Sequence, residues 1–149
     1  MSTAAAAQTL DQKRAAHAWQ SVEEAKKLAE SDQADFRGHA KKLPMRIRAA
    51  GLGQALSFVN AKLADKDKAG LKLLLLTLNG WVLTERGLRG SADPTQPKAL
   101  IEEICTRDAA YLKRATLEVM AYLQWLNRFT EAAALGGEAA VPGGDQGAE

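Results

Sequence analysis

The sequence of 149 residues has one cysteine, Cys105, and only two histidines, His17 and His39. A single cysteine cannot form an internal disulfide, which excludes a cystine-stapled secreted domain. Strand-forming residues are also scarce, with five valines and three isoleucines against 29 alanines and 20 leucines. Because alanine and leucine are the strongest helix formers, an all-β fold is excluded and an α/β sheet is disfavoured.

Neither a secretion signal nor a membrane-spanning pattern is visible in the sequence. Residues 1–8 have no basic start and no long apolar core. The most apolar stretch, 71–83, is shorter than the ~20 residues that cross a bilayer, and Lys72 and Asn79 interrupt it. We interpret this stretch as a buried helix and expect a cytoplasmic protein with no membrane association.

Groups suited to catalysis or metal binding are few. The two histidines do not have helical spacing, and one cysteine cannot make a zinc site. No glycine-rich phosphate loop with a following lysine is present. Glu102, Glu103 and Glu118 are candidate acids, but helical carboxylates usually face solvent or pair with basic residues. We therefore expect no catalytic residue, no metal, no cofactor and no enzymatic activity.

The spacing of apolar residues predicts an all-α fold, a compact bundle of five to six helices in a single domain at 9–135. Thr9 and Gln12 form a capping box at the start of the first helix, and 31–33 is expected to end it. Pro44 must kink the second helix or start a new one. Further helices are expected at 34–50, 54–64, 68–84, 98–105 and 108–135. The Gly-rich acidic tail, 136–149, is expected to be disordered.

Charge is distributed unevenly along the chain. Residues 130–149 carry four acids and no base, which leaves 20 bases and 14 acids in the remainder. No acid occurs from Phe36 to Ala64, and such a basic segment favours a polyanionic partner, with a solvated face as the alternative. On a helix at 34–50, three of its bases share one face and Lys42 and Arg46 lie beside it. The bases are Arg37, Lys41, Lys42, Arg46, Arg48 and Lys62.

Aromatic residues could stack on nucleic-acid bases, as they do in single-strand binders. Five of them, however, lie on or near an apolar stripe of a predicted helix. We therefore expect them in the core. They are Trp19, Phe36, Phe58, Trp81 and Trp125.

Three segments together resemble a known family. They contain QKRAA at 12–16, KLP at 42–44 followed by GLGQAL at 51–56, and RAT at 114–116 followed by WLNRF at 125–129. In this order and spacing they resemble the small helical subunit of the type III-B CRISPR RAMP-module effector, the Cmr complex, over about residues 9–135. Two features depart from the family: Asn127, where lysine is frequent, and the tail after Leu135.

The resemblance implies an all-helical protein that acts in antiviral defence. Its partners would be the other Cmr subunits, copies of itself stacked as a minor filament, guide RNA and target RNA, while another subunit cleaves the target. Phosphate contacts bind RNA without reading bases, which suits a complex whose specificity comes from RNA pairing. We expect these contacts from Arg14, Arg37, Lys41, Lys42, Arg46, Arg48 and Lys62.

Two alternatives predict other partners for the basic segment. A small helical DNA-binding regulator would use 34–50 as its recognition helix and would bind duplex DNA tightly. A purely scaffolding subunit would never touch nucleic acid, and its cations would pair with acids on neighbouring subunits.

Overall fold

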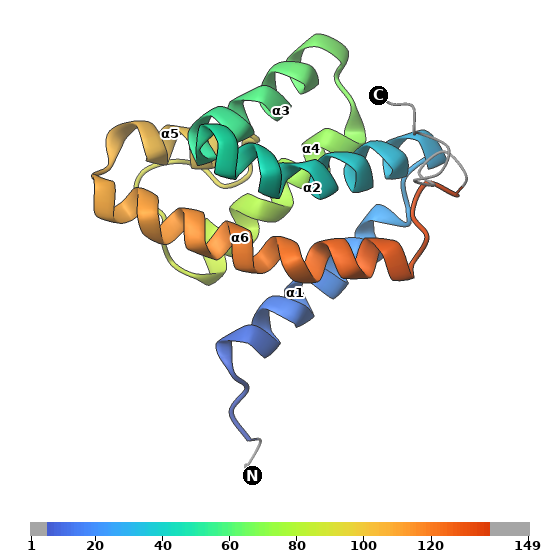
Figure 1. Cartoon of the computed structure of the whole chain (residues 1–149), viewed down its shortest axis with the longest axis horizontal. Helices are drawn as coiled ribbons and strands as arrows, with labels where there is room; N and C mark the ends of the chain where they lie inside the picture. Colours follow the sequence, from blue (N-terminus) through green and yellow to red (C-terminus); the bar gives the residue numbers. More distant parts are fainter. Residues whose placement is uncertain (1–5, 138–149) are drawn as a thin grey trace.

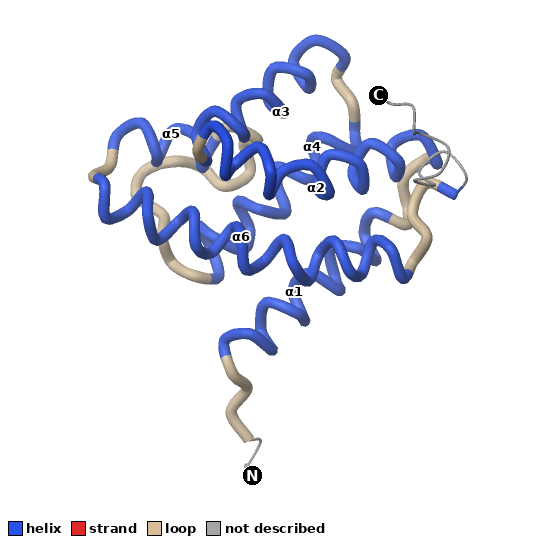
Figure 2. The backbone as a smooth tube through the Cα atoms, in the orientation of Figure 1, coloured by secondary structure: helices blue, strands red, loops and turns tan. Residues whose placement is uncertain are grey.

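Helices account for nearly all of the regular structure. The computed structural model describes residues 6–137, and that part of the chain contains α-helices, one π-helix and no strand (Figure 2). This confirms the all-α fold class. Beyond Gly137, the predicted tail lies outside the described residues. The elements are α1 (Leu10–Ala25), α2 (Glu30–Ala50), α3 (Leu52–Lys66), α4 (Ala69–Asn79), the π-helix η1 (Gly80–Glu85), α5 (Ala99–Thr106) and α6 (Ala109–Ala132).

The apolar helix α4 lies at the centre of the core, as the sequence predicts. It packs against α2 and α3, and also against α1 and α5. α2 in turn lies between α3 and α6, while α1 crosses α6 (Figure 1). Burial of apolar side chains stabilises this arrangement by about 25 cal/mol for each Å² removed from water. The largest fully buried side chains include Phe36, Leu43, Leu71, Leu74, Leu78, Tyr122 and Leu126.

The predicted end of the first helix is wrong. Its start is confirmed, because Thr9 and Gln12 form the capping box with bonds of 3.0 and 2.8 Å. The helix ends at Ala25, however, and residues 31–33 belong to the first turn of α2. The side-chain amide of Gln33 donates to the carbonyls of residues 26 and 28, so Gln33 satisfies the end of α1 from within the next helix.

α2 continues through Pro44, so the proline does not begin a new helix. A proline has no N–H, and its position in a helix leaves the carbonyl four residues earlier without its usual donor. That carbonyl belongs to Ala40, and the side-chain amide of Asn127 on α6 donates to it at 3.0 Å. A neighbouring helix therefore supplies the hydrogen bond that the proline removes.

The helix predicted at 68–84 changes from an α-helix to a π-helix. It is α-helical to Asn79 and π-helical from Gly80 to Glu85, and the N–H of Arg86 donates to the carbonyl of Trp81 at 2.9 Å. Such wider turns are rare and often occur at functional sites. Here the π-helix lies against α4 and α6 and places Trp81 in the core at 2% exposure.

Candidate nucleic-acid interface

The acid-free segment, Phe36 to Ala64, consists of most of α2, the turn at Gly51 and most of α3. We call this bent segment the elbow. Gly51 joins the two helices with φ +90° and ψ 161°, a conformation that favours glycine because it has no Cβ. The turn brings the end of α2 against α3, where Phe58 is 43% exposed. The guanidinium carbon of Arg46 lies 4.3 Å from the centre of the Phe58 ring, and Nζ of Lys62 lies 5.1 Å from it. Two predicted site residues from different helices thus meet at one aromatic ring.

The pKa of His39 responds to its partial burial and to the positive charges of this elbow. Nδ1 of His39 lies 3.3 Å from Nη1 of Arg46, which fits a neutral ring that accepts the guanidinium N–H. Burial, followed by the charges of Arg46, Lys42, Lys62 and Lys68, lowers the pKa of His39 to about 4. The ring is therefore uncharged at neutral pH, because it is partly buried and the charges of four cations act on it.

Within the described residues, the predicted cations of α2 and α3 make no ion pair. Within residues 6–137, none of Arg37, Lys41, Lys42, Arg46, Arg48 and Lys62 lies within 4.0 Å of a carboxylate oxygen. The charges of these six side chains are thus not neutralised within the described chain. Such a surface can bind phosphate groups through long-range attraction and direct contact.

These cations do not form one continuous stripe on α2. Lys42 and Arg46 lie on the flank that meets α3. On the opposite flank, Arg37 donates to the carbonyl of Leu135 beyond the end of α6, at 3.3 Å. Helical spacing places Lys41 and Arg48 on the same flank as Arg37, and both are exposed. The two sets of cations therefore lie on different flanks of α2, which packs against both α3 and α6.

Arg14 lies in a different environment from the other six. Its Nε and Nη2 donate to the two carboxylate oxygens of Glu118 at 3.3 and 3.2 Å, and Nη1 donates to Asp11. Glu118 also accepts from Trp81 at 3.0 Å and from Arg86 at 3.1 Å. Burial opposes ionisation of Glu118, but the hydrogen bonds from Arg14, Trp81 and Arg86 outweigh it and lower its pKa. This network joins α1, η1 and α6.

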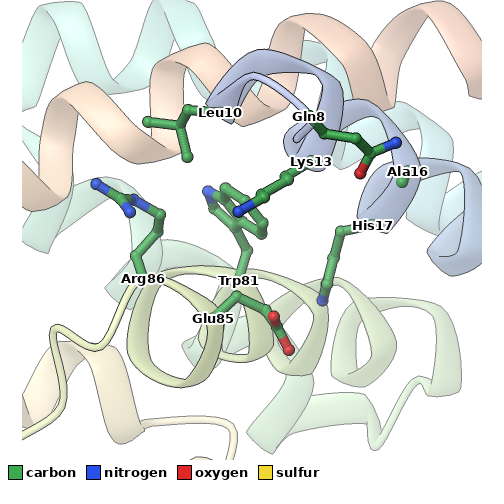
Figure 3. Close-up of a pocket in the computed structure, with 8 residues that line it drawn as sticks. All are labelled: Gln8, Leu10, Lys13, Ala16, His17, Trp81, Glu85 and Arg86. Atoms are coloured by element: carbon green, nitrogen blue, oxygen red, sulfur yellow. The ribbon is translucent and has the colours of Figure 1, made fainter. Parts of the chain in front are cut away.

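A cleft of about 590 Å³ lies beside this network between α1 and η1. In Figure 3, Trp81 occupies the middle of the cleft, with side chains from α1 and from the π-helix around it. Nδ1 of His17 lies 2.7 Å from the hydroxyl of Tyr122. Burial lowers the pKa of His17, although Glu85 opposes this effect. The cleft is lined by Gln8, Leu10, Lys13, Ala16, His17, Trp81, Glu85 and Arg86.

Several polar groups in and beside this cleft hydrogen-bond to other side chains. One nitrogen of His17 is occupied by Tyr122, and the nearby carboxylate of Glu118 is held by two arginines and an indole. No group of three His, Cys, Asp or Glu side chains in the described part of the chain is placed to hold a metal ion.

Among the same residues, no helix has the length and apolarity needed to span a membrane.

The prediction that Trp19, Phe36, Phe58, Trp81 and Trp125 all lie in the core is wrong for two of them. Phe36 and Trp81 are buried, and Trp125 is partly buried. Trp19, at 54% exposure, packs edge-on against Phe129 with ring centres 5.2 Å apart, while Phe58 lies at the elbow. The buried stripe of α1 consists of small side chains, so its neighbour Trp19 remains outside. For Phe58, the one sequence signal was Lys62 four residues later, a spacing that places a cation beside the ring.

Comparison with known proteins identifies the family of the chain. A family model described as "CRISPR-associated protein (Cas_Cmr5)" matches residues 10–133. The chain is thus a CRISPR-associated protein of the small, all-helical kind. It belongs to the Cmr5 family.

Relatives from Thermus thermophilus support this assignment. The curated protein "CRISPR system Cmr subunit Cmr5" is 35% identical over 125 residues, which cover 83% of this chain and 95% of that protein. A crystal structure of a CRISPR-associated Cmr5 family protein from the same organism superposes with a TM-score of 0.65 at 33% identity. The superposition covers 84% of this chain and 97% of the other.

Proposed function

We propose that this protein is a non-catalytic structural subunit of a Cmr effector complex, in which it contacts RNA through its basic elbow. The named subunit from Thermus supports the assignment to a Cmr complex. The subunit would act in the cytoplasm, stack with copies of itself and lie alongside guide RNA and target RNA. Its other partners would be the remaining Cmr subunits, one of which would cleave the target.

The main support for an RNA contact is that, in residues 6–137, the predicted cations of α2 and α3 have no acidic partner. We assign phosphate contact first to Lys42, Arg46 and Lys62, which surround Phe58 and His39. Arg37, Lys41 and Arg48 would make a second set of contacts on the other flank of α2. Arg14 is engaged with Glu118, so we assign it to stability rather than to RNA binding.

The experiment is a charge reversal in the assembled complex. Subunits carrying Lys42→Glu and Arg46→Glu are incorporated, and affinity for target RNA is measured over a series of salt concentrations. The slope of log affinity against log salt should decrease in magnitude by about 0.7 for each lost contact with a single strand. Equal subunit composition of the wild-type and variant complexes is verified first.

A matched control changes the net charge by the same amount at a different place. Lys26→Glu with Lys27→Glu is suitable because each lysine already pairs with a glutamate on α1, at 2.9 and 3.2 Å. The control should leave the salt slope unchanged. An unchanged slope for the elbow variant would support the scaffolding alternative instead. Tight binding of duplex DNA by the isolated chain would support the DNA-binding regulator.

A further inference from the structure

A hollow of about 270 Å³ opens at the elbow between α2 and α3. Arg46, Gln54 and Phe58 are among the residues that line it. The remaining residues are alanines, whose methyl groups leave room beside the ring. The lining consists of Arg46, Ala49, Ala50, Gln54, Ala55 and Phe58.

The chemistry of the lining fits a flat aromatic ring that carries hydrogen-bonding groups at its edge. Aromatic side chains and arginine planes are the protein surfaces on which unpaired bases stack. An exposed glutamine amide both donates and accepts, so Gln54 can pair with the edge of such a ring. A single exposed phenylalanine would be unremarkable by itself. Phe58, however, is flanked by two cations and faces an apolar hollow.

The positive charge around the hollow favours a flat aromatic group that is attached to negative charges. None of the residues that line the hollow is acidic, and no acid occurs between Phe36 and Ala64. Nζ of Lys62 lies 5.1 Å from the centre of the Phe58 ring, and Lys42 lies one helical turn before Arg46 on α2. Both lysines are exposed, and neither has a carboxylate within 4.0 Å in residues 6–137. A nucleotide strand carries a phosphate on each side of every base, which matches an aromatic hollow between cations.

We propose that this hollow receives one unpaired base of an RNA strand, whose flanking phosphates lie on Lys42 and Lys62. This inference rests on the proposed RNA contact and adds a preference for unpaired over paired strands. A base within a duplex is stacked on its neighbours, so it cannot enter the hollow. The elbow therefore binds a splayed-out nucleotide, whatever its identity, because stacking accepts every base.

Two substitutions of Phe58 test the proposal in the full-length chain. Phe58→Leu keeps an apolar side chain but removes the ring, and Phe58→Tyr keeps the ring. Binding is measured by fluorescence anisotropy with a short labelled oligouridylate and with a blunt RNA duplex of equal length. The leucine variant should bind the single strand at least about fivefold more weakly, while the tyrosine variant binds it as the wild type does. Affinity for the duplex and the salt slope should not change, because no charge is removed.

The Lys42→Glu, Arg46→Glu chain, measured in parallel, separates this proposal from the RNA contact on which it rests. If the charge variant loses affinity and the leucine variant does not, the base site is overturned and the phosphate contacts stand. Equal losses for duplex and single strand in the leucine variant also overturn it, since Phe58 would then only position the cations. If neither variant loses affinity, both proposals fail. Unfolding midpoints of the variants establish that each chain is folded.

Discussion

The side-chain amide of Asn127 donates a 3.0 Å hydrogen bond to the carbonyl of Ala40, the group that Pro44 leaves without a helical donor. The sequence alone marked Asn127 only as a departure from the family that the chain resembles. The structure gives Asn127 a different role, because its short amide reaches the backbone of α2 from α6. The proline and the asparagine are therefore coupled across the interface of these helices.

This coupling predicts a non-additive pair of substitutions. Asn127→Ala should lower the free energy of unfolding by about 1–3 kcal/mol, because a buried carbonyl loses its donor. In a Pro44→Ala background the same substitution should cost less, since residue 44 then supplies a backbone N–H to Ala40. Urea unfolding of the four chains measures the interaction energy. An equal cost of Asn127→Ala in both backgrounds would contradict the coupling.

The assignment of Arg14 to stability predicts a different pattern. Arg14→Ala leaves the buried carboxylate of Glu118 with fewer donors, so the free energy of unfolding should fall by about 1–3 kcal/mol. Lys13→Ala, at an exposed position on the same helix, should change it by less than about 0.5 kcal/mol. The salt dependence of RNA binding should be unaffected by either. A shallower salt slope for Arg14→Ala would return Arg14 to the RNA-binding set.

His39 makes stability depend on pH. Its pKa in the folded protein is about 4, below the ordinary histidine value of 6.5, so the unfolded chain takes up a proton first as pH falls. Stability is therefore full above about pH 6.5 and decreases as pH falls towards 4. Between pH 7 and pH 5 the wild type should lose about 1 kcal/mol through this group, after allowance for screening of a half-exposed ring.

The comparison that checks this effect uses His39→Gln. Urea unfolding at pH 7 and pH 5 should show a smaller loss of stability for the variant than for the wild type. Some loss remains in both, because the pKa of His17 is lowered as well. Equal losses in the two proteins would mean that burial and the neighbouring cations do not lower the pKa of His39 in the folded protein.

Much of the fold could be predicted because its signals are local. The capping box at Thr9, the apolar run of α4 and the glycine turn at Gly51 each depend on residues close together in sequence. The end of α1 could not be predicted in this way, since Gln33 closes it from the next helix. The same limit applies to Asn127, whose partner lies 87 positions away.

In the candidate site, too, local features could be predicted and long-range contacts could not. Its cations could be identified from an acid-free run of sequence, but their partners could not. The ion pair between Arg14 and Glu118 spans 104 positions, so Arg14 appeared equivalent to the cations of α2. The meeting of Arg46 with Phe58 depends on the angle between two helices, which periodicity does not determine. Sequence therefore identified the charge, and the fold determined which charges share a surface.

The most direct test of the RNA-binding elbow is a photochemical cross-link in the assembled complex. Target RNA containing 4-thiouridine is irradiated in the complex, the protein is digested with trypsin, and cross-linked peptides are identified by mass spectrometry. Cleavage after Arg48 and Lys62 isolates residues 49–62, the peptide that carries Gln54 and Phe58. If the elbow contacts RNA, cross-links occur in this peptide and disappear in the Lys42→Glu, Arg46→Glu complex. Cross-links confined to α1 or α6, with none in 49–62, would contradict this contact.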